Sequence, residues 1–129
     1  MDADAEAREL VERTRTRFPE EALITDQWLR ERGWALDEVT FVWIEAFADR
    51  TSEAVKRHDE AVIKAHTEFM ATEHRQGSES VRSLVDVAYA ENLMWDLDVS
   101  DRVWAWPHIA RTVRALYEAI WGVPKNANT

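Results

Sequence analysis

Two glutamates stand in unusually apolar stretches of this chain, and they are the residues most suited to acid–base chemistry. Glu45 lies within FVWIEAFA and Glu91 within VAYAENLMW. Burying a carboxylate is costly unless it is paired, and burial raises its pKa. Asp49 follows Glu45 by one helical turn, and His58 falls on the apolar stripe of the same run. If these four residues converge, they form a buried polar site that could hold a metal or transfer protons.

A structural interpretation of the same residues is simpler. A helix that is apolar almost all round still keeps one edge in water, and a single glutamate often marks that edge. Such a carboxylate can also bond to a tryptophan, a tyrosine or an arginine such as Arg50 or Arg111. His58 is better explained as a core histidine bonded to a carboxylate or a carbonyl. An enzyme or metal protein that uses Glu45 and Glu91 therefore stays an alternative.

Known catalytic and cofactor motifs are missing from the sequence. It contains neither HExxH, nor the Glu-x-x-His pair of di-iron bundles, nor a GxSxG elbow or glycine-rich phosphate loop. His58, His66 and His74 are eight residues apart, so they rotate around a helix and cannot share one metal. Without cysteine there is no thiolate nucleophile and no disulfide. We expect a protein that is not an enzyme and that has no metal and no cofactor.

Tryptophan is over-represented, with seven residues. Trp104 and Trp106 lie two positions apart beside Pro107, so we do not expect both to face inward. Tryptophan is enriched where proteins bind one another. Three acidic residues adjoin this pair: Asp96, Asp98 and Asp101. An aromatic anchor ringed by carboxylates would suit a basic protein partner. Tryptophan also packs a small bundle efficiently, because each ring buries so much area. Trp43, Trp95 and Trp121 are assigned to the core on this ground, whereas both interpretations stay open for Trp104 and Trp106.

The charge balance narrows the classes of partner. The net charge is −9 and the isoelectric point about 4.9, so the surface repels nucleic acids and anionic membranes. The same charge favours basic protein partners, or it serves solubility alone. An acidic mimic of DNA is disfavoured because 16 Lys and Arg residues are interspersed among the acids. The amino terminus, MDADAEAREL, is unlike a signal peptide, and no apolar run approaches the roughly 20 residues that span a bilayer. We expect a cytoplasmic protein that binds neither nucleic acid nor membrane.

The elements that must position these residues are marked by glycine and proline. The three glycines each follow a long glycine-free run, while Pro19 and Pro107 each open one. This pattern predicts an all-α, single-domain antiparallel bundle of five to six helices over residues 1–122, with a flexible tail over 123–129. The predicted helices cover about 4–18, 19–33, 37–75, 79–95 and 107–122, with a short helical turn at 103–106.

Three local expectations accompany this layout. Ile24 and Trp28 should form the buried edge of the second helix. The long run 37–75 should break near residue 50, where Thr51 and Ser52 could cap a fresh start. Residues 96–101 should form a polar turn.

The stretch from FVWIEAFADRT through VAYAENLMWDL to the final helix resembles small bacterial helical domains. The small acidic helical layout is also similar to bacterial immunity proteins, including the helical type that neutralises nucleases. The resemblance covers roughly residues 38–121 and carries over no individual binding residue. It implies a protein that blocks a toxin by binding it, without catalysis. A structural or regulatory homodimer, paired through an apolar helix face, stays a further alternative.

Overall fold

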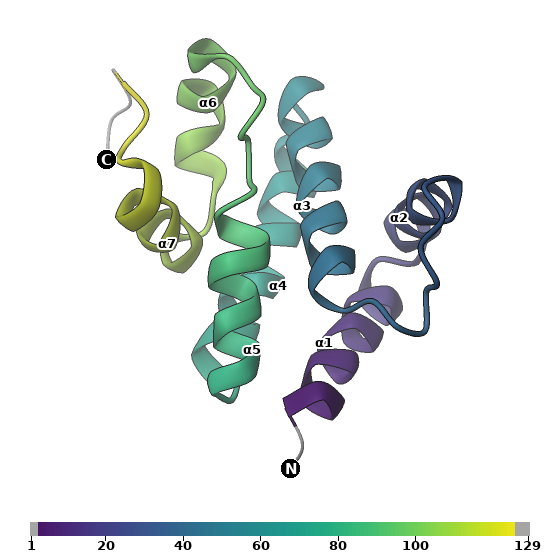
Figure 1. The fold of residues 1–129 in the computed structure, drawn as a ribbon. Helices are drawn as coiled ribbons and strands as arrows, with labels where there is room; N and C mark the ends of the chain where they lie inside the picture. The colour runs from purple at the N-terminus through teal and green to yellow at the C-terminus, as the bar shows by residue number, and fades with distance from the viewer. Residues whose placement is uncertain (1–2, 126–129) are drawn as a thin grey trace.

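The computed structural model describes residues 3–125, and every regular element in that range is helical (Figure 1). This confirms the all-α prediction. The elements are α1 (Ala3–Arg17), α2 (Pro19–Glu31), α3 (Phe41–Lys56), α4 (Glu60–Gln76), α5 (Glu79–Ser83), the π-helix η1 (Leu84–Ala90), α6 (Val99–Ala105), the 3-10 turn η2 (Trp106–His108) and α7 (Arg111–Trp121). The seven α-helices in residues 3–125 exceed the five or six predicted.

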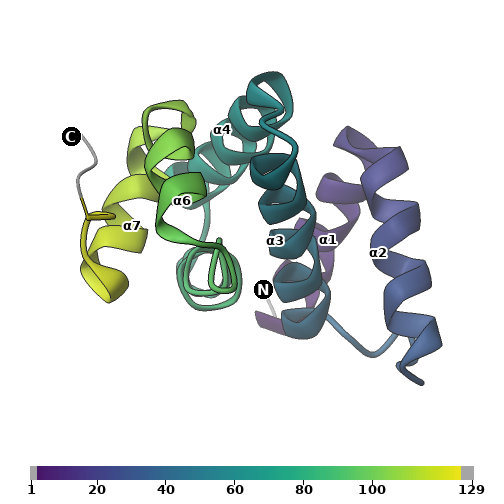
Figure 2. The same ribbon diagram turned by 90° about the horizontal axis from the view of Figure 1, so that it is seen from above.

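The central element of the fold is α3. It packs most extensively against η1, α2 and α4, and it also reaches α1 and α6. Seen from above, α1 and α2 lie on one side of α3, while α6 and α7 lie on the other (Figure 2). Trp43, Phe47 and Val55 recur on its inner face and are fully buried in a core to which all seven α-helices contribute.

The break between α3 and α4 falls at residues 57–59, not near residue 50 as predicted. Thr51 and Ser52 do not cap a helix, because both are buried and bond inside the core. The chain instead turns at His58, which adopts a left-handed conformation with φ 56°. Asp59 then caps α4 by accepting a 3.3 Å hydrogen bond from the backbone N–H of Val62.

The prediction for the buried side of α2 was wrong. Ile24 and Trp28 are 42% and 38% exposed. The buried side instead carries Ala22, Thr25, Asp26 and Leu29. Asp26 accepts hydrogen bonds from Arg15 at 2.7 Å and from the indole of Trp43 at 2.8 Å. Because a buried carboxylate must be paired, this contact fixes the rotation of α2 and turns Ile24 and Trp28 outward.

The segment after α5 departs from a regular helix. It widens into the π-helix η1, and Met94 then takes a left-handed conformation with φ 59°. The backbone N–H of Met94 donates a 2.9 Å hydrogen bond to Ser52. Trp95, expected in the core, is consequently 64% exposed. Trp121 is also exposed, at 56%, whereas Trp43 is fully buried as predicted.

In the last third of the chain, α6 begins earlier than the helical turn predicted at 103–106. Asp98 caps α6 by accepting a hydrogen bond of 3.0 Å from the N–H of Asp101, so the predicted polar turn becomes the start of a helix. Pro107 lies in η2 and does not open α7. The chain first passes through Ala110, whose N–H donates to Thr67 on α4 at 3.0 Å.

The predicted tail begins inside the described residues. Val123 packs against the core and Pro124 is buried. Residues 126–129 lie outside the described residues.

Candidate functional site

Glu45 and Glu91 lie near each other, at α3 and at the end of η1, and both are partly buried. Burial raises the pKa of Glu45, a hydrogen bond of 3.3 Å from the side-chain amide of Asn92 opposes that rise, and the charge of Glu91 adds to it. Within residues 3–125, no group of three His, Asp or Glu side chains is arranged to hold a metal ion. No third His, Asp or Glu of the described residues joins the two glutamates in such a group.

His58 lies apart from this pair, in the exposed turn between α3 and α4. Its imidazole stacks on the indole of Trp104, with ring centroids 3.9 Å apart and planes inclined by 5°. Its Nε2 atom is 3.3 Å from the carboxylate of Asp101. Placing His58 in the core was thus wrong, because the left-handed turn points its ring outward towards α6. Two half-buried residues of the predicted anchor, Trp104 and Asp101, form a cluster with it.

Trp106 packs in the core, and Asp98 caps α6. Trp106 is 1% exposed and packs edge-on against Tyr117, with centroids 5.7 Å apart. It cannot anchor a partner from inside the core. Asp98 accepts hydrogen bonds from the N–H of Asp101 and the hydroxyl of Ser100, and the backbone bond contributes most to lowering its pKa. The predicted anchor around Trp104 is therefore divided between surface and core.

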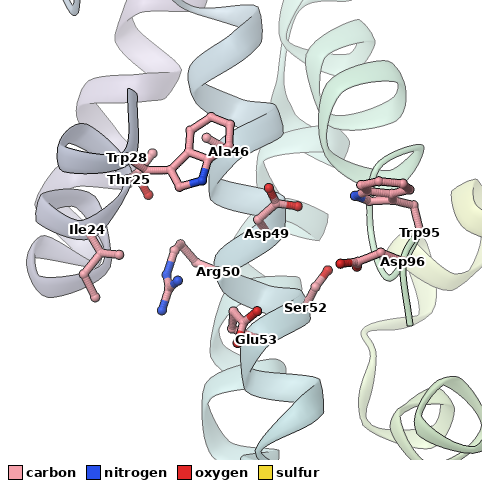
Figure 3. Close-up of a pocket in the computed structure, with 10 residues that line it drawn as sticks. All are labelled: Ile24, Thr25, Trp28, Ala46, Asp49, Arg50, Ser52, Glu53, Trp95 and Asp96. Atoms are coloured by element: carbon pink, nitrogen blue, oxygen red, sulfur yellow. The ribbon is translucent and has the colours of Figure 1, made fainter. Parts of the chain in front are cut away.

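The two predicted sites each contribute one residue to the lining of a pocket of about 270 Å³. Asp49 comes from the predicted polar site and Asp96 from the predicted anchor. Figure 3 shows α3 as the floor of this pocket, Trp28 of α2 on one wall, and Trp95 with Asp96 on the opposite wall. We call it the α2–α3 pocket. Sequence reasoning missed both of its aromatic walls.

Negative charge dominates the α2–α3 pocket. Its lining includes three carboxylates, Asp49, Glu53 and Asp96, and one guanidinium, Arg50. Arg50 donates a 2.8 Å hydrogen bond to Glu21, which does not line the pocket.

Lys56 neutralises part of this charge. Its ammonium lies 3.3 Å from Glu53 and 3.9 Å from Asp96. Asp49 has no ion-pair partner among the described side chains.

Asp49 is the most perturbed carboxylate of the pocket. Burial raises its pKa, and the charge of Asp96 raises it further, while a hydrogen bond with the Trp95 side chain lowers it. A cation that entered the pocket would lower the pKa of Asp49, because a positive charge favours the ionised carboxylate. Trp95 supplies a second attraction, since cations bind to the faces of indole rings. The Trp28 ring already carries the guanidinium of Arg32, 3.8 Å from its centroid. The pocket is thus suited to bind a positively charged group.

Comparison with known proteins identifies a family but no activity. Residues 11–122 match the family described as a domain of unknown function (DUF7674). This range includes every residue that lines the α2–α3 pocket. No curated protein and no solved structure matches the chain. None of the helices in the described range combines the length and the apolar character that crossing a membrane requires.

Proposed function

The chain belongs to the DUF7674 family, and we propose that this member is a non-enzymatic, acidic binding protein for a basic protein partner. Its α2–α3 pocket receives a lysine or arginine side chain of that partner. The observation that carries the proposal is the placement of two exposed tryptophans around Asp49, a carboxylate without a direct ion pair among the described side chains. An immunity-type inhibitor that neutralises a toxin in the cytoplasm is the biological role that these properties fit.

Charge decides which kind of side chain enters. With Arg50 bound to Glu21 and Lys56 shared by Glu53 and Asp96, Asp49 lacks a direct ion pair, and the charge of Arg50 has only a minor effect on its pKa. A guanidinium or ammonium beside Asp49 restores neutrality, and charge-assisted hydrogen bonds of this kind are stronger than neutral ones. The partly buried floor lowers the local dielectric constant, so the attraction exceeds that between the same charges in water.

The size of the pocket favours a side chain over a free small molecule. Small-molecule sites commonly have volumes of about 300–1,000 Å³. The α2–α3 pocket, at about 270 Å³, lies below that range. It also opens beside a helix face that a protein partner can cover.

That helix face extends the contact area. Leu23, Ile24 and Trp28 are exposed along the outer side of α2, and Trp34 follows in the loop after it. A stable interface buries about 800 Å² on each partner, far more than one side-chain pocket supplies. The outer face of α2 provides the surrounding contact, while the net charge of −9 accelerates association with a basic protein.

Affinity capture with matched baits tests the proposal. The wild-type chain, Trp95→Ala and Asp49→Asn are compared with two controls, Trp121→Ala and Asp37→Asn, which remove an exposed tryptophan and an exposed acid outside the pocket. We expect a basic protein to be retained by the wild type and by both controls, and lost from both pocket variants.

Calorimetry with the purified partner then gives the magnitude. Hot-spot tryptophans contribute about 2 kcal/mol or more, so Trp95→Ala should weaken binding by about 30-fold. The association rate should fall as salt is added. Equal affinity of Trp95→Ala and the wild type would overturn the proposal.

A homodimer through the outer face of α2 is the competing use of the same exposed residues. Sedimentation of the purified protein separates the two. A dimer that Ile24→Lys dissociates would assign this face to a second copy of the chain, whereas a monomer at high concentration leaves it free for a different partner.

The acid pair favours one further candidate, a proton-transfer enzyme, because the pKa of Glu45 is raised by burial and by Glu91. Glu45→Gln separates this candidate from the binding protein. The variant should leave partner binding unchanged if the α2–α3 pocket is the functional site.

A further inference from the structure

Two buried side-chain nitrogens within residues 3–125 have no hydrogen-bond partner: Nε of Arg102 and Nε1 of Trp106. Both are N–H donors, so each of them lacks an acceptor. They are four residues apart, which places them one turn apart on the same side of α6 and η2. Native proteins rarely leave buried donors unpaired, and an ion or a water that completes them is a common explanation.

A pocket of about 210 Å³ lies beside Trp106. Its other wall is one side of α7, formed by Arg111, Arg114, Ala115 and Glu118. We call it the α7 pocket. It shares no lining residue with the α2–α3 pocket, and α7 and α2 lie on opposite sides of α3 in both views (Figures 1 and 2).

The α7 pocket carries positive charge in an otherwise acidic protein. Arg111 and Arg114 stand at the start of α7, and the first turn of that helix contains no acidic residue. Neither guanidinium has a hydrogen-bond or ion-pair partner in the part of the chain that the structure describes. Arginine at the amino end of a helix opposes the helix dipole, whose positive end lies there. Two arginines there repel each other and the dipole unless an anion compensates them.

We propose that the α7 pocket binds an oxyanion of the phosphate class. Arg111 and Arg114 neutralise its charge, and the indole N–H of Trp106 donates a hydrogen bond to it. A phosphate group carries up to two negative charges and three acceptor oxygens, which match several donors better than the single charge of a carboxylate does. Glu118 limits the site to the amino-terminal end of α7, because its carboxylate repels an anion.

Nuclear magnetic resonance of the indole N–H groups tests this site directly. The full-length protein is titrated with inorganic phosphate, phenyl phosphate and acetate, and the Trp106 signal is assigned through its contacts with Tyr117. We expect a saturable shift of the Trp106 signal with inorganic phosphate and a much weaker response to acetate. Tighter binding of phenyl phosphate would identify a phosphate ester, rather than the free ion, as the natural source.

Variants at the exposed wall of the pocket complete the test. Arg111→Gln and Arg114→Gln should each weaken phosphate binding by about tenfold, since each removes a charge-assisted hydrogen bond. Arg82→Gln is the matched control, because Arg82 is an exposed arginine of α5 outside the pocket. Phosphate should also raise the melting temperature of the wild type and of Arg82→Gln more than that of the pocket variants.

The proposal is overturned if inorganic phosphate produces no saturable shift of the Trp106 signal. It is also overturned if acetate binds as well as phosphate does, or if the double variant of Arg111 and Arg114 binds phosphate like the wild type. None of these results depends on whether the α2–α3 pocket binds a basic partner.

Discussion

The indole nitrogen of Trp43 donates a 2.8 Å hydrogen bond to the carboxylate of Asp26, and this bond joins α3 to α2 inside the core. Arg15 of α1 binds the same carboxylate and lies over the Trp43 ring, 5.1 Å from its centroid. Asp26 is only 5% exposed, so three helices meet at one buried negative charge. This contact sets the rotation of α2 and, with it, the wall of the α2–α3 pocket.

Removing that carboxylate should destabilise the protein strongly. Asp26→Ala leaves the Trp43 indole and the Arg15 guanidinium without their acceptor, and breaking a buried pair in this way costs about 3 kcal/mol. Chemical denaturation measures the change in the free energy of unfolding. Asp26→Asn is the milder control, because its amide oxygen can still accept the Trp43 bond. A loss in Asp26→Ala no larger than that in Asp37→Asn would contradict this assignment.

Asp49→Asn should weaken partner binding and slightly stabilise the free protein. Because burial and Asp96 raise the pKa of Asp49, its ionised form is unfavourable in the folded state. Stability is therefore lost as pH rises through the folded-state pKa, and the asparagine variant avoids that loss. Solvent screens this partly exposed group, so we expect a gain of a few tenths of a kcal/mol at neutral pH.

The binding measurement is the counterpart of this stability measurement. Removing one charge-assisted contact from the α2–α3 pocket should weaken partner affinity by about tenfold. Binding to the wild type should also release protons in mildly acidic solution, because a guest cation lowers the pKa of Asp49. If Asp49→Asn is less stable than the wild type at neutral pH, Asp49 is a structural residue.

The buried pair of Thr51 and His66 predicts a pH dependence of stability. Thr51 bonds at 2.9 Å to Nδ1 of His66 and at 2.8 Å to the hydroxyl of Tyr89. Burial lowers the pKa of His66 from 6.5 to about 4. The folded protein therefore binds fewer protons than the unfolded chain between these two values, and stability falls as pH decreases through that window.

The full loss amounts to about 3 kcal/mol at about 1.4 kcal/mol per pKa unit. Denaturation curves at a series of pH values measure it, and His66→Gln should flatten the dependence. A wild-type curve with no decrease between neutral pH and the lower pKa would contradict the buried, neutral state of His66.

Gly77→Ala should destabilise the turn between α4 and α5. A Cβ atom at this position would lie 2.5 Å from the carbonyl oxygen of Glu73 and 2.6 Å from a methyl group of Val81. Such overpacking costs about 1–3 kcal/mol. The comparison variant is Gly33→Ala, where a Cβ meets open space and only the backbone strain at φ 83° opposes alanine. Thermal unfolding compares them, and a larger loss in Gly33→Ala would contradict the packing argument.

Helical class and most helix positions could be predicted, because glycine, proline and the spacing of apolar residues act locally. The rotation of each helix could not. Ile24 and Trp28 have helical spacing and large apolar side chains, yet Asp26 on the same helix occupies the core. The decisive contacts, with Arg15 and Trp43, join residues from three helices, so no local pattern contains them.

The candidate site was predicted only in part, for a related reason. Asp49 and Asp96 were both singled out, but as members of two different sites. Bringing them together requires the chain to leave the helix at Met94, where a non-glycine residue takes a positive φ. Sequence patterns give little warning of such a conformation. The same applies to His58, whose left-handed turn moves it from the predicted core to the side of Trp104.

The π-helix η1 has an evolutionary consequence. A π turn behaves as one residue inserted into an α-helix, and each residue rotates the following side chains by about 100° around the axis. Losing a single position in this segment would restore ordinary winding and change the direction in which the chain enters the Met94 turn. Relatives with and without that residue would thus share every helix of the fold but present Trp95 differently, so partner choice could diverge through a change in length alone.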